Sequence, residues 1–447
     1  MNFTRRTFLR SSLGAASLAL GAGLMPRRAR AAGADRNFLF VYFGGGWDTL
    51  MSLDPRDPGR FSESRIDQTK IQLGWDRLPN AYPRDIIQPS GSNIDFGPVM
   101  GGISQHFDKM SVVRGISMDT VTHAVGMRYF LTGMTPRGLS AAGSSLGTRI
   151  AAQQGKSLPI PNLVSRVETY NEGLPVYSTG LAVNGAVDLV TTLRDGPQAP
   201  TGAVRTRLDE FRARTANCDP ALLDKKGLMS QVAATQSEAR ALVEGRLFSL
   251  FNLNDRNNPD IVAVRDRYGI TNGNAVTPGT QAAIAFQALK HNVAQTVTIE
   301  LVNGLDTHAG TWATDHADSQ AAGWTALGQL VTDLSTTNHD SGGTLLDRTT
   351  ILVFSEFGRT ALINSRDGRD HSLTSSCALI GAGVPHNKVI GASTDVGMAP
   401  QAINPMTGEV EEGGTVLNPN NIAASIMQSA GFDTDALRTD GVPALMA

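Results

Sequence analysis

Five short apolar runs constrain the fold of this chain most strongly. Each is rich in Val, Ile, Phe or Leu and ends in a polar or glycine-rich turn. The runs are residues 37–43, 110–116, 296–302, 349–354 and 376–380. Because they lack polar alternation, they are typical of strands buried on both faces of a parallel sheet.

Helical patterns lie between these runs. They cover residues 145–153, 219–251, 280–292, 317–335 and 421–430. Alternation of buried strands with helices predicts an α/β fold with three layers, α/β/α, around a mostly parallel central sheet. We expect one large domain over residues 32–447, with a largely helical insertion at about 173–292 that covers the sheet.

The first 31 residues have the pattern of a twin-arginine signal peptide. Arg5 and Arg6 precede a weakly apolar run over residues 11–25, and residues 29–31 supply the small-x-small pattern of a cleavage site. The alternative is an ordinary amphipathic N-terminal helix, but this run has no polar face. We therefore expect export by the twin-arginine translocase, a mature chain that begins near Ala32, and a periplasmic or secreted location.

Composition excludes several classes of protein. The chain has 39 basic and 41 acidic residues, so no basic footprint for nucleic acid is visible. After the leader no run approaches about 18 apolar residues, and we expect no membrane span in the mature chain. The two cysteines, Cys218 and Cys377, form no Cys-x-x-Cys pair. Export permits a disulfide between them, although the apolar surroundings of Cys377 favour a buried free thiol.

Residue types that can bind metals follow the predicted strands. In an open parallel sheet, ligands bind beyond the carboxyl ends of the strands. The clusters to inspect are residues 44–49, 119–123, 306–308, 355–359 and 368–371. Asp306 and His308 are two residues apart, so an extended backbone turns both to one face. A single Asp or His in a loop is more often a capping residue, but five clusters at strand ends together favour a site.

The ligand types indicate which metals fit. A mixed set of carboxylates and imidazoles suits zinc, manganese or iron, whereas a set dominated by carboxylates admits magnesium or calcium. Two other motifs are weaker. Residues 44–48 lack the third glycine of a dinucleotide fingerprint and the Lys of a P-loop. Residues 143–147 match a nucleophile elbow, but no strand precedes them, and Ser144 is better interpreted as a helix cap.

The order of the clusters resembles the alkaline phosphatase and sulfatase superfamily, and specifically its exported family of unknown function called DUF1501. The segments that carry this resemblance are residues 43–48, 123–133, 304–308, 355–360 and 368–371. The resemblance covers nearly the whole mature chain. It implies an alkaline phosphatase-like fold and one or two divalent metals, which would be zinc, manganese, calcium or magnesium.

The resemblance also implies roles for particular residues. The metal ligands it implies are Asp48, Asp306, His308, Glu356 and His371, with Asp370 or His316 as a further candidate. His123 falls on the nucleophile position in an ungapped count, and a shift of one residue offers Thr122 instead. His123 is equally a candidate ligand. Phe357 stands where the superfamily places a histidine, which favours one metal over two.

Two arginines near these clusters are candidate anion binders. Arg128 and Arg359 offer the bidentate geometry that suits a pair of anionic oxygens. For Arg359 a structural ion pair near Glu356 is an equal alternative.

The function that follows from the resemblance is an exported, metal-dependent hydrolase of phosphate or sulfate esters, acting on a small anionic ester. The altered nucleophile position motivates an alternative, a non-catalytic secreted or surface-assembly binding protein that retains the fold and a structural metal. A mutase or transferase on the same fold stays open, since hydrolysis and transfer differ only in the acceptor.

Overall fold

The computed structural model describes residues 36–156, 158–196, 199–215 and 242–447. The predicted leader, Cys218 and most of the helix predicted at 219–251 lie outside these residues. Among the described residues, no helix is long and apolar enough to cross a membrane.

The core of the protein is an eight-stranded sheet with the order β10-β2-β9-β6-β1-β5-β3-β4. Its strands are β1 (Asn37–Phe43), β2 (Met110–Ser117), β3 (Asn162–Ser165), β4 (Leu181–Val183), β5 (Thr296–Val302), β6 (Thr349–Phe354), β9 (Thr374–Gly381) and β10 (Lys388–Ile390). All neighbouring pairs are parallel except those that β9 forms with β2 and β6. The predicted mostly parallel sheet is confirmed, and all five apolar runs are strands of it.

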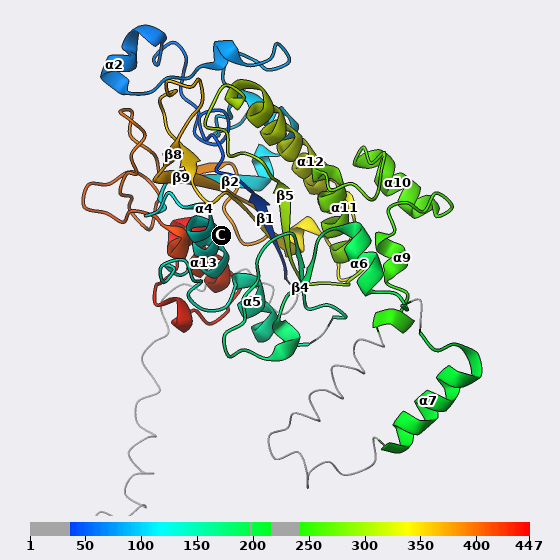
Figure 1. Ribbon diagram of the computed structural model, residues 1–447. Coiled ribbons are helices and arrows are strands. Elements are labelled where there is room, and N and C mark those ends of the chain that lie inside the picture. Colours follow the sequence, from blue (N-terminus) through cyan, green and yellow to red (C-terminus); the bar gives the residue numbers. More distant parts are fainter. Residues whose placement is uncertain (1–35, 157, 197–198, 216–241) are drawn as a thin grey trace, which may run out of the picture.

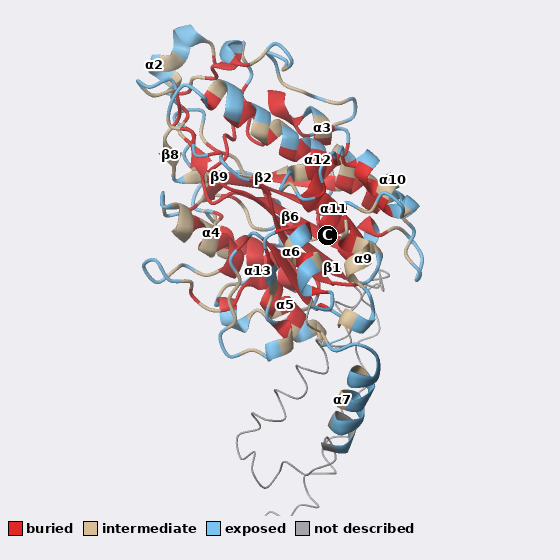
Figure 2. Ribbon diagram, turned by 45° about the vertical axis from the view of Figure 1, so that its right-hand side comes forward, coloured by how far each residue is buried: buried red, intermediate tan, exposed pale blue. Residues whose placement is uncertain are grey.

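The sheet is buried on both faces. Along β1, Leu39, Val41 and Phe43 belong to one hydrophobic core, and Phe38 and Phe40 belong to the other. Successive side chains of a strand point to opposite faces, so each core takes every second residue. Burial of each such side chain contributes roughly 1.5–3 kcal/mol. Figure 2 shows the buried residues concentrated in the sheet and in the helix faces that cover it.

Helices cover both faces of the sheet and complete the predicted three layers. The α-helices of the described residues are α2 (Ile66–Thr69), α3 (Gly101–Ser104), α4 (His123–Thr132), α5 (Leu146–Gln154), α6 (Ala186–Thr192), α7 (Gly202–Thr215), α9 (Phe248–Phe251), α10 (Pro259–Arg267), α11 (Pro278–Lys290), α12 (Ala317–Thr336) and α13 (Pro419–Ser429); α2 and α7 lie away from the sheet. In Figure 1, α11 and α12 lie on one side of the sheet, and α4, α5 and α13 lie on the other. The region predicted as an insertion contains β4, which extends the main sheet beside β3.

The antiparallel strand β9 matters for the site. Its amino end lies at the edge where β6 and β1 have their carboxyl ends, so the segment before β9 reaches that edge. There β8 (His371–Ser372) pairs with β7 (Gly358–Arg359), which follows β6. The apolar sequence of β9 did not indicate its direction, because a strand buried on both faces has the same composition either way. Cys377 lies within β9 as a buried free thiol.

A glycine allows α4 to approach the sheet closely. Gly126 lies against the backbone of Glu356, and a β-carbon at position 126 would overlap the Glu356 carbonyl oxygen. This contact fixes the distance between the first turn of α4 and the end of β6.

We therefore expect Gly126→Ala to destabilise the protein by about 1–3 kcal/mol, because the added methyl group forces α4 away from Glu356. Denaturant unfolding measures the change. Gly101→Ala in α3 is the control, since its β-carbon would have only the tip of Ile87, 4.0 Å away, as a neighbour. Equal stability of Gly126→Ala and the unmodified protein would contradict this packing.

Candidate metal centre

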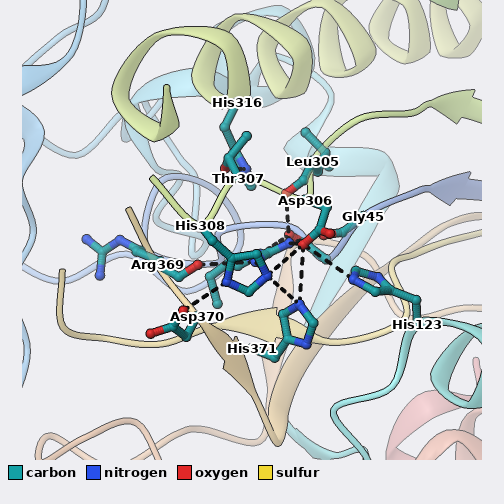
Figure 3. A network of polar contacts seen from close by, with 12 residues as sticks. Gly45, His123, Leu305, Asp306, Thr307, His308, His316, Arg369, Asp370 and His371 are labelled. Carbon is teal, nitrogen blue, oxygen red and sulfur yellow. Dashed lines mark hydrogen bonds and ion pairs between the residues drawn. The ribbon is translucent and has the colours of Figure 1, made fainter. Parts of the chain in front are cut away.

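Three histidines surround the carboxylate of Asp306. Its Oδ1 atom lies 2.9 Å from His308 Nε2 and 3.3 Å from Nε2 of both His123 and His371. Figure 3 shows the three rings turned toward this oxygen. One ligand atom from each of His123, Asp306 and His371 lies within 4.8 Å of the others, as a shared metal ion requires.

The residues come from separate strand ends at one edge of the sheet. His123 is the first residue of α4, which follows β2. Asp306 and His308 lie in the loop after β5, and His371 begins β8 before β9. The carboxyl ends of parallel strands meet at this edge, and the antiparallel β9 adds His371 to them. The fold therefore brings together four of the residues that the sequence analysis singled out.

Each histidine is oriented through its other ring nitrogen. His123 Nδ1 lies 2.7 Å from Glu356 Oε1, and His308 Nδ1 lies 2.8 Å from Asp370 Oδ1. His371 Nδ1 lies 2.7 Å from the carbonyl oxygen of Val121. Carboxylates and carbonyls accept hydrogen bonds, so each Nδ1 is assigned the proton and each Nε2 keeps its lone pair. Histidines that bind metals are usually held in this way.

Among the described residues, one donor reaches an Nε2 lone pair: Arg359 Nη1 lies 3.5 Å from His308 Nε2, a long hydrogen bond. His308 Nε2 and His371 Nε2 are 3.0 Å apart, a contact that is repulsive unless a proton or a cation lies between them. His123 Nε2 is buried and makes no hydrogen bond. The ligand atoms of His123, Asp306 and His371 form a donor set that fits a divalent cation, and the lone pair of His308 Nε2 lies beside them.

Glu356 holds His123 and is not free to bind a metal. Its side chain is 1% exposed, and Oε1 also accepts a hydrogen bond from the backbone N–H of Gly45, while Oε2 accepts one from Ser355. Burial alone would raise the pKa of Glu356, but the bonds from His123 and Ser355 hold that pKa below its ordinary value. Glu356 in turn raises the pKa of His123. Glu356, a predicted ligand, thus orients His123, as Asp370 orients His308.

Asp48 is engaged away from the three histidines. Its Oδ1 accepts the backbone N–H groups of Leu50 and Met51, and its Oδ2 pairs with Arg369 Nε at 2.8 Å and with the indole of Trp312. Both oxygens are therefore occupied, Oδ1 by the backbone of the turn after β1 and Oδ2 by a buried ion pair.

Arg359 is a buried structural partner of the cluster. Its Nη2 donates to Asp306 Oδ1 at 2.9 Å, and its Nη1 lies 3.5 Å from His308 Nε2. Its N–H groups also bond backbone carbonyls, among them those of Gly46, Leu305 and Arg369. Its side chain is fully buried, so it offers no free edge to an anion. Burial would raise the pKa of Asp306, but the hydrogen bond from Arg359 and its positive charge hold that pKa far below its ordinary value.

Arg128 and Thr122 differ in what they leave available. Arg128 binds both oxygens of Glu168 and also reaches Tyr170, so its guanidinium is engaged outside the cluster. Thr122 is exposed at the N-cap of α4, directly before His123, and no hydrogen bond of its hydroxyl is found among the described residues. The structure leaves Thr122 accessible beside the cluster.

His316 contacts the loop that carries Asp306 and His308. This buried residue lies in a π-helical turn before α12; its Nδ1 lies 2.9 Å from the hydroxyl of Thr307, and its Nε2 accepts the backbone N–H of Asp48. Burial lowers the pKa of His316 to about 4, so the ring is neutral. Neither this role nor that of the Val121 carbonyl has a sequence signal, because both depend on contacts between distant segments.

Comparison with known proteins adds a family and a set of distant structures. The family model described as "Protein of unknown function (DUF1501)" matches residues 35–439. No curated protein matches the chain.

Three solved structures illustrate the similarity. A protein in the alkaline phosphatase superfamily from Vibrio parahaemolyticus is 8% identical, over 94% of this chain and 71% of its own, with a TM-score of 0.41. The protein Ps i-CgsB in complex with k-i-k-neocarrahexaose is 9% identical, over 92% and 75%, with a TM-score of 0.39. A mutant of TAB5 alkaline phosphatase with magnesium bound is 11% identical, over 90% and 99%, with a TM-score of 0.32. At these values no activity passes from these proteins to this chain.

We expect Asp370→Ala to weaken metal binding about 10- to 100-fold, because His308 loses the bond that orients its ring. Stability should change little, since the Asp370 side chain is 50% exposed. Competition titration with a chromophoric chelator measures the affinity. Asp367→Asn, in the same loop but paired with Arg77, is the control. Unchanged affinity in Asp370→Ala would show that this bond does not prepare the ligand.

Proposed function

Because the chain belongs to the DUF1501 family, whose description states no function, we propose one from its site: a metal-dependent hydrolase of phosphate or sulfate esters. The observation that carries this proposal is the convergence of three histidine Nε2 atoms on Asp306 Oδ1, each ring oriented through its Nδ1. His123, Asp306, His308 and His371 are the proposed ligands.

The donor set favours particular metals. Three imidazole nitrogens and one carboxylate suit zinc, manganese or iron, whereas magnesium and calcium prefer sets made of oxygen. When bound, such an ion supplies Lewis-acid chemistry, which lowers the pKa of a nucleophile and offsets charge on a transferring phosphoryl or sulfuryl group. We therefore propose zinc or manganese ahead of magnesium or calcium.

The chain supplies a nucleophile candidate beside the ligands. Thr122 carries an exposed hydroxyl at the amino end of α4, where the helix dipole favours negative charge. His123 is less suited to attack, because Glu356 fixes one of its nitrogens and the other faces Asp306. In this proposal Thr122 Oγ loses its proton to solvent and attacks the phosphorus or sulfur, the ester bond breaks, and the alcohol leaves with a proton from solvent. Water then releases phosphate or sulfate and restores Thr122, and the amino end of α4 stabilises the anionic oxygens.

Export in the folded state agrees with this site. The four proposed ligands come from three separate strand ends, so the metal site exists only after folding. The twin-arginine route carries folded proteins, which would allow the metal to be loaded before export. We propose that the translocase is the partner of the chain during export and that the protein acts in the periplasm or outside the cell.

One observation favours a second candidate, a non-catalytic binding protein with a structural metal. Arg359 and Arg128 are both engaged by protein groups, so neither is free to clamp a transferring group. Both candidate functions predict a bound metal, but only the hydrolase predicts turnover of an ester.

The double variant Asp306→Asn with His308→Ala should lose its metal, because it removes the central oxygen and one of the three imidazoles. Elemental analysis of the purified variant measures the metal content, and circular dichroism checks the fold. Asp367→Asn is the matched control and should retain metal. A double variant that retains one ion per chain would place the metal elsewhere.

Thr122→Ala should lower the rate of ester hydrolysis at least 100-fold, because it removes the attacking oxygen. The metal content should stay unchanged, because no ligand is removed. Aryl phosphate, phosphodiester and aryl sulfate substrates with zinc or manganese provide the assay. Hydrolysis that survives in Thr122→Ala would exclude this nucleophile. No turnover with any of these substrates in the metal-loaded protein would favour the binding protein.

A further inference from the structure

An arginine with a half-used guanidinium lies at the same sheet edge as the cluster. Arg166 directly follows β3, and its backbone N–H donates to the Val183 carbonyl of β4. Its φ angle is 62°, in the left-handed region that bulky residues seldom adopt. Backbone strain of this kind is concentrated at sites that bind ligands.

Glu300 holds this arginine by one N–H only. Arg166 Nε donates to Glu300 Oε2 at 2.8 Å, while the other oxygen of Glu300 accepts from Asn303 at 2.7 Å. Nη1 and Nη2 of Arg166 make no hydrogen bond or ion pair with the residues that the structure describes, and the side chain is 31% exposed. The guanidinium is therefore fixed at one edge and open at the other, where Nη1 and Nη2 can bind two oxygens of an anion.

Two open cavities meet at Arg166. One, of about 260 Å³, lies between β5 and the helices α11 and α12, with Thr277 and Pro278 at the amino end of α11 in its wall. The other, of about 370 Å³, is bounded by residues that follow β3 and β4, such as Val167 and Asn184. Both volumes are several times the roughly 30 Å³ that a water molecule occupies, so they accommodate a molecule larger than an inorganic ion. The dipole of the 13-residue α11 adds positive potential.

Glu300, in the wall of the first cavity, is linked to the Asp306 cluster by two glycines. Gly44 lies against Glu300, where a β-carbon would be 3.0 Å from Oε1. The next residue, Gly45, donates its backbone N–H to Glu356, and Glu356 holds His123. A molecule bound at the cluster can therefore extend along this edge of the sheet toward Arg166.

A second arginine nearby shows the contrast. Arg128 donates Nε and Nη2 to the two oxygens of Glu168, and its Nη1 bonds the carbonyl of Leu139. Its fork is filled by protein groups, whereas that of Arg166 is open. Arg128 is therefore a matched control for any test of Arg166.

We propose that Arg166 binds an oxyanion group of the substrate, which is a sulfate, a phosphate or a carboxylate. The reacting ester of the same substrate lies at the Asp306 cluster. The substrate is then an ester that carries a second negative charge. The link to the ester rests on the proposed function, but the binding of an anion by Arg166 does not.

Selenate, an isostere of sulfate that is visible by anomalous scattering, is the probe. Crystals of the full chain soaked in selenate should show a selenate ion hydrogen-bonded to Nη1 and Nη2 of Arg166. Calorimetric titration should give the affinity of the protein for selenate. Arg166→Ala should weaken this binding at least tenfold. Arg166→Lys, which keeps a cation beside Glu300 but loses the fork, should also weaken it, while Arg128→Lys should not. Competition by inorganic phosphate and by acetate then ranks the three oxyanions.

Selenate bound only at the cluster, selenate bound nowhere, or binding unchanged in Arg166→Lys would overturn the proposal. The same titration on Asp306→Asn separates the two hypotheses, because selenate should still bind Arg166 when the metal site is disabled. Retained anion binding without hydrolysis would contradict only the proposed function, and hydrolysis without anion binding at Arg166 would contradict only this inference.

Discussion

The buried carboxylate of Glu356 connects three elements of the site. It follows β6, accepts the N–H of Gly45 after β1, and orients His123 at the start of α4. Because the carboxylate is almost fully buried, each of these bonds replaces water that burial removed, and loss of one leaves a charge without compensation. The close packing of Gly126 against the Glu356 backbone fixes two of these elements, α4 and the end of β6.

The cluster around Asp306 has the electrostatics of a site built for a cation. Arg359 and three histidines surround a single carboxylate oxygen, yet the Nε2 atoms of His308 and His371 face each other at 3.0 Å. Their Nδ1 protons are committed to Asp370 and to a backbone carbonyl, so neither ring has a second proton in its neutral form. Either one ring is protonated or a metal lies among them, and the separate anchoring of three rings is the arrangement that metal sites use.

Much of this could be predicted from the sequence. The bounds of β1, β5 and β6 agree with the apolar runs to the residue, because a strand buried on both faces ends where its polar turn begins. Asp306, His308 and His371 could be predicted as candidate ligands because the strand ends of a parallel sheet converge. The direction of β9 was not predictable from its composition.

The division of labour within the site was also beyond the sequence. Asp48, Glu356 and Asp370 are of residue types that bind metals. Each carboxylate instead contacts a nearby donor, which is Arg369 for Asp48, His123 for Glu356 and His308 for Asp370. Which oxygen meets which partner depends on contacts between segments that are far apart in the chain. The open fork of Arg166 escaped notice for the same reason, since only the structure shows which of its N–H groups are used.

The most direct test of the metal centre is elemental analysis of the unmodified protein, purified without chelator after export. The account predicts about one zinc, manganese or iron ion per chain, removed by strong chelators and restored by adding the same metal. Protein that is folded but holds no transition metal, and that binds none when metal is supplied, would contradict the central claim.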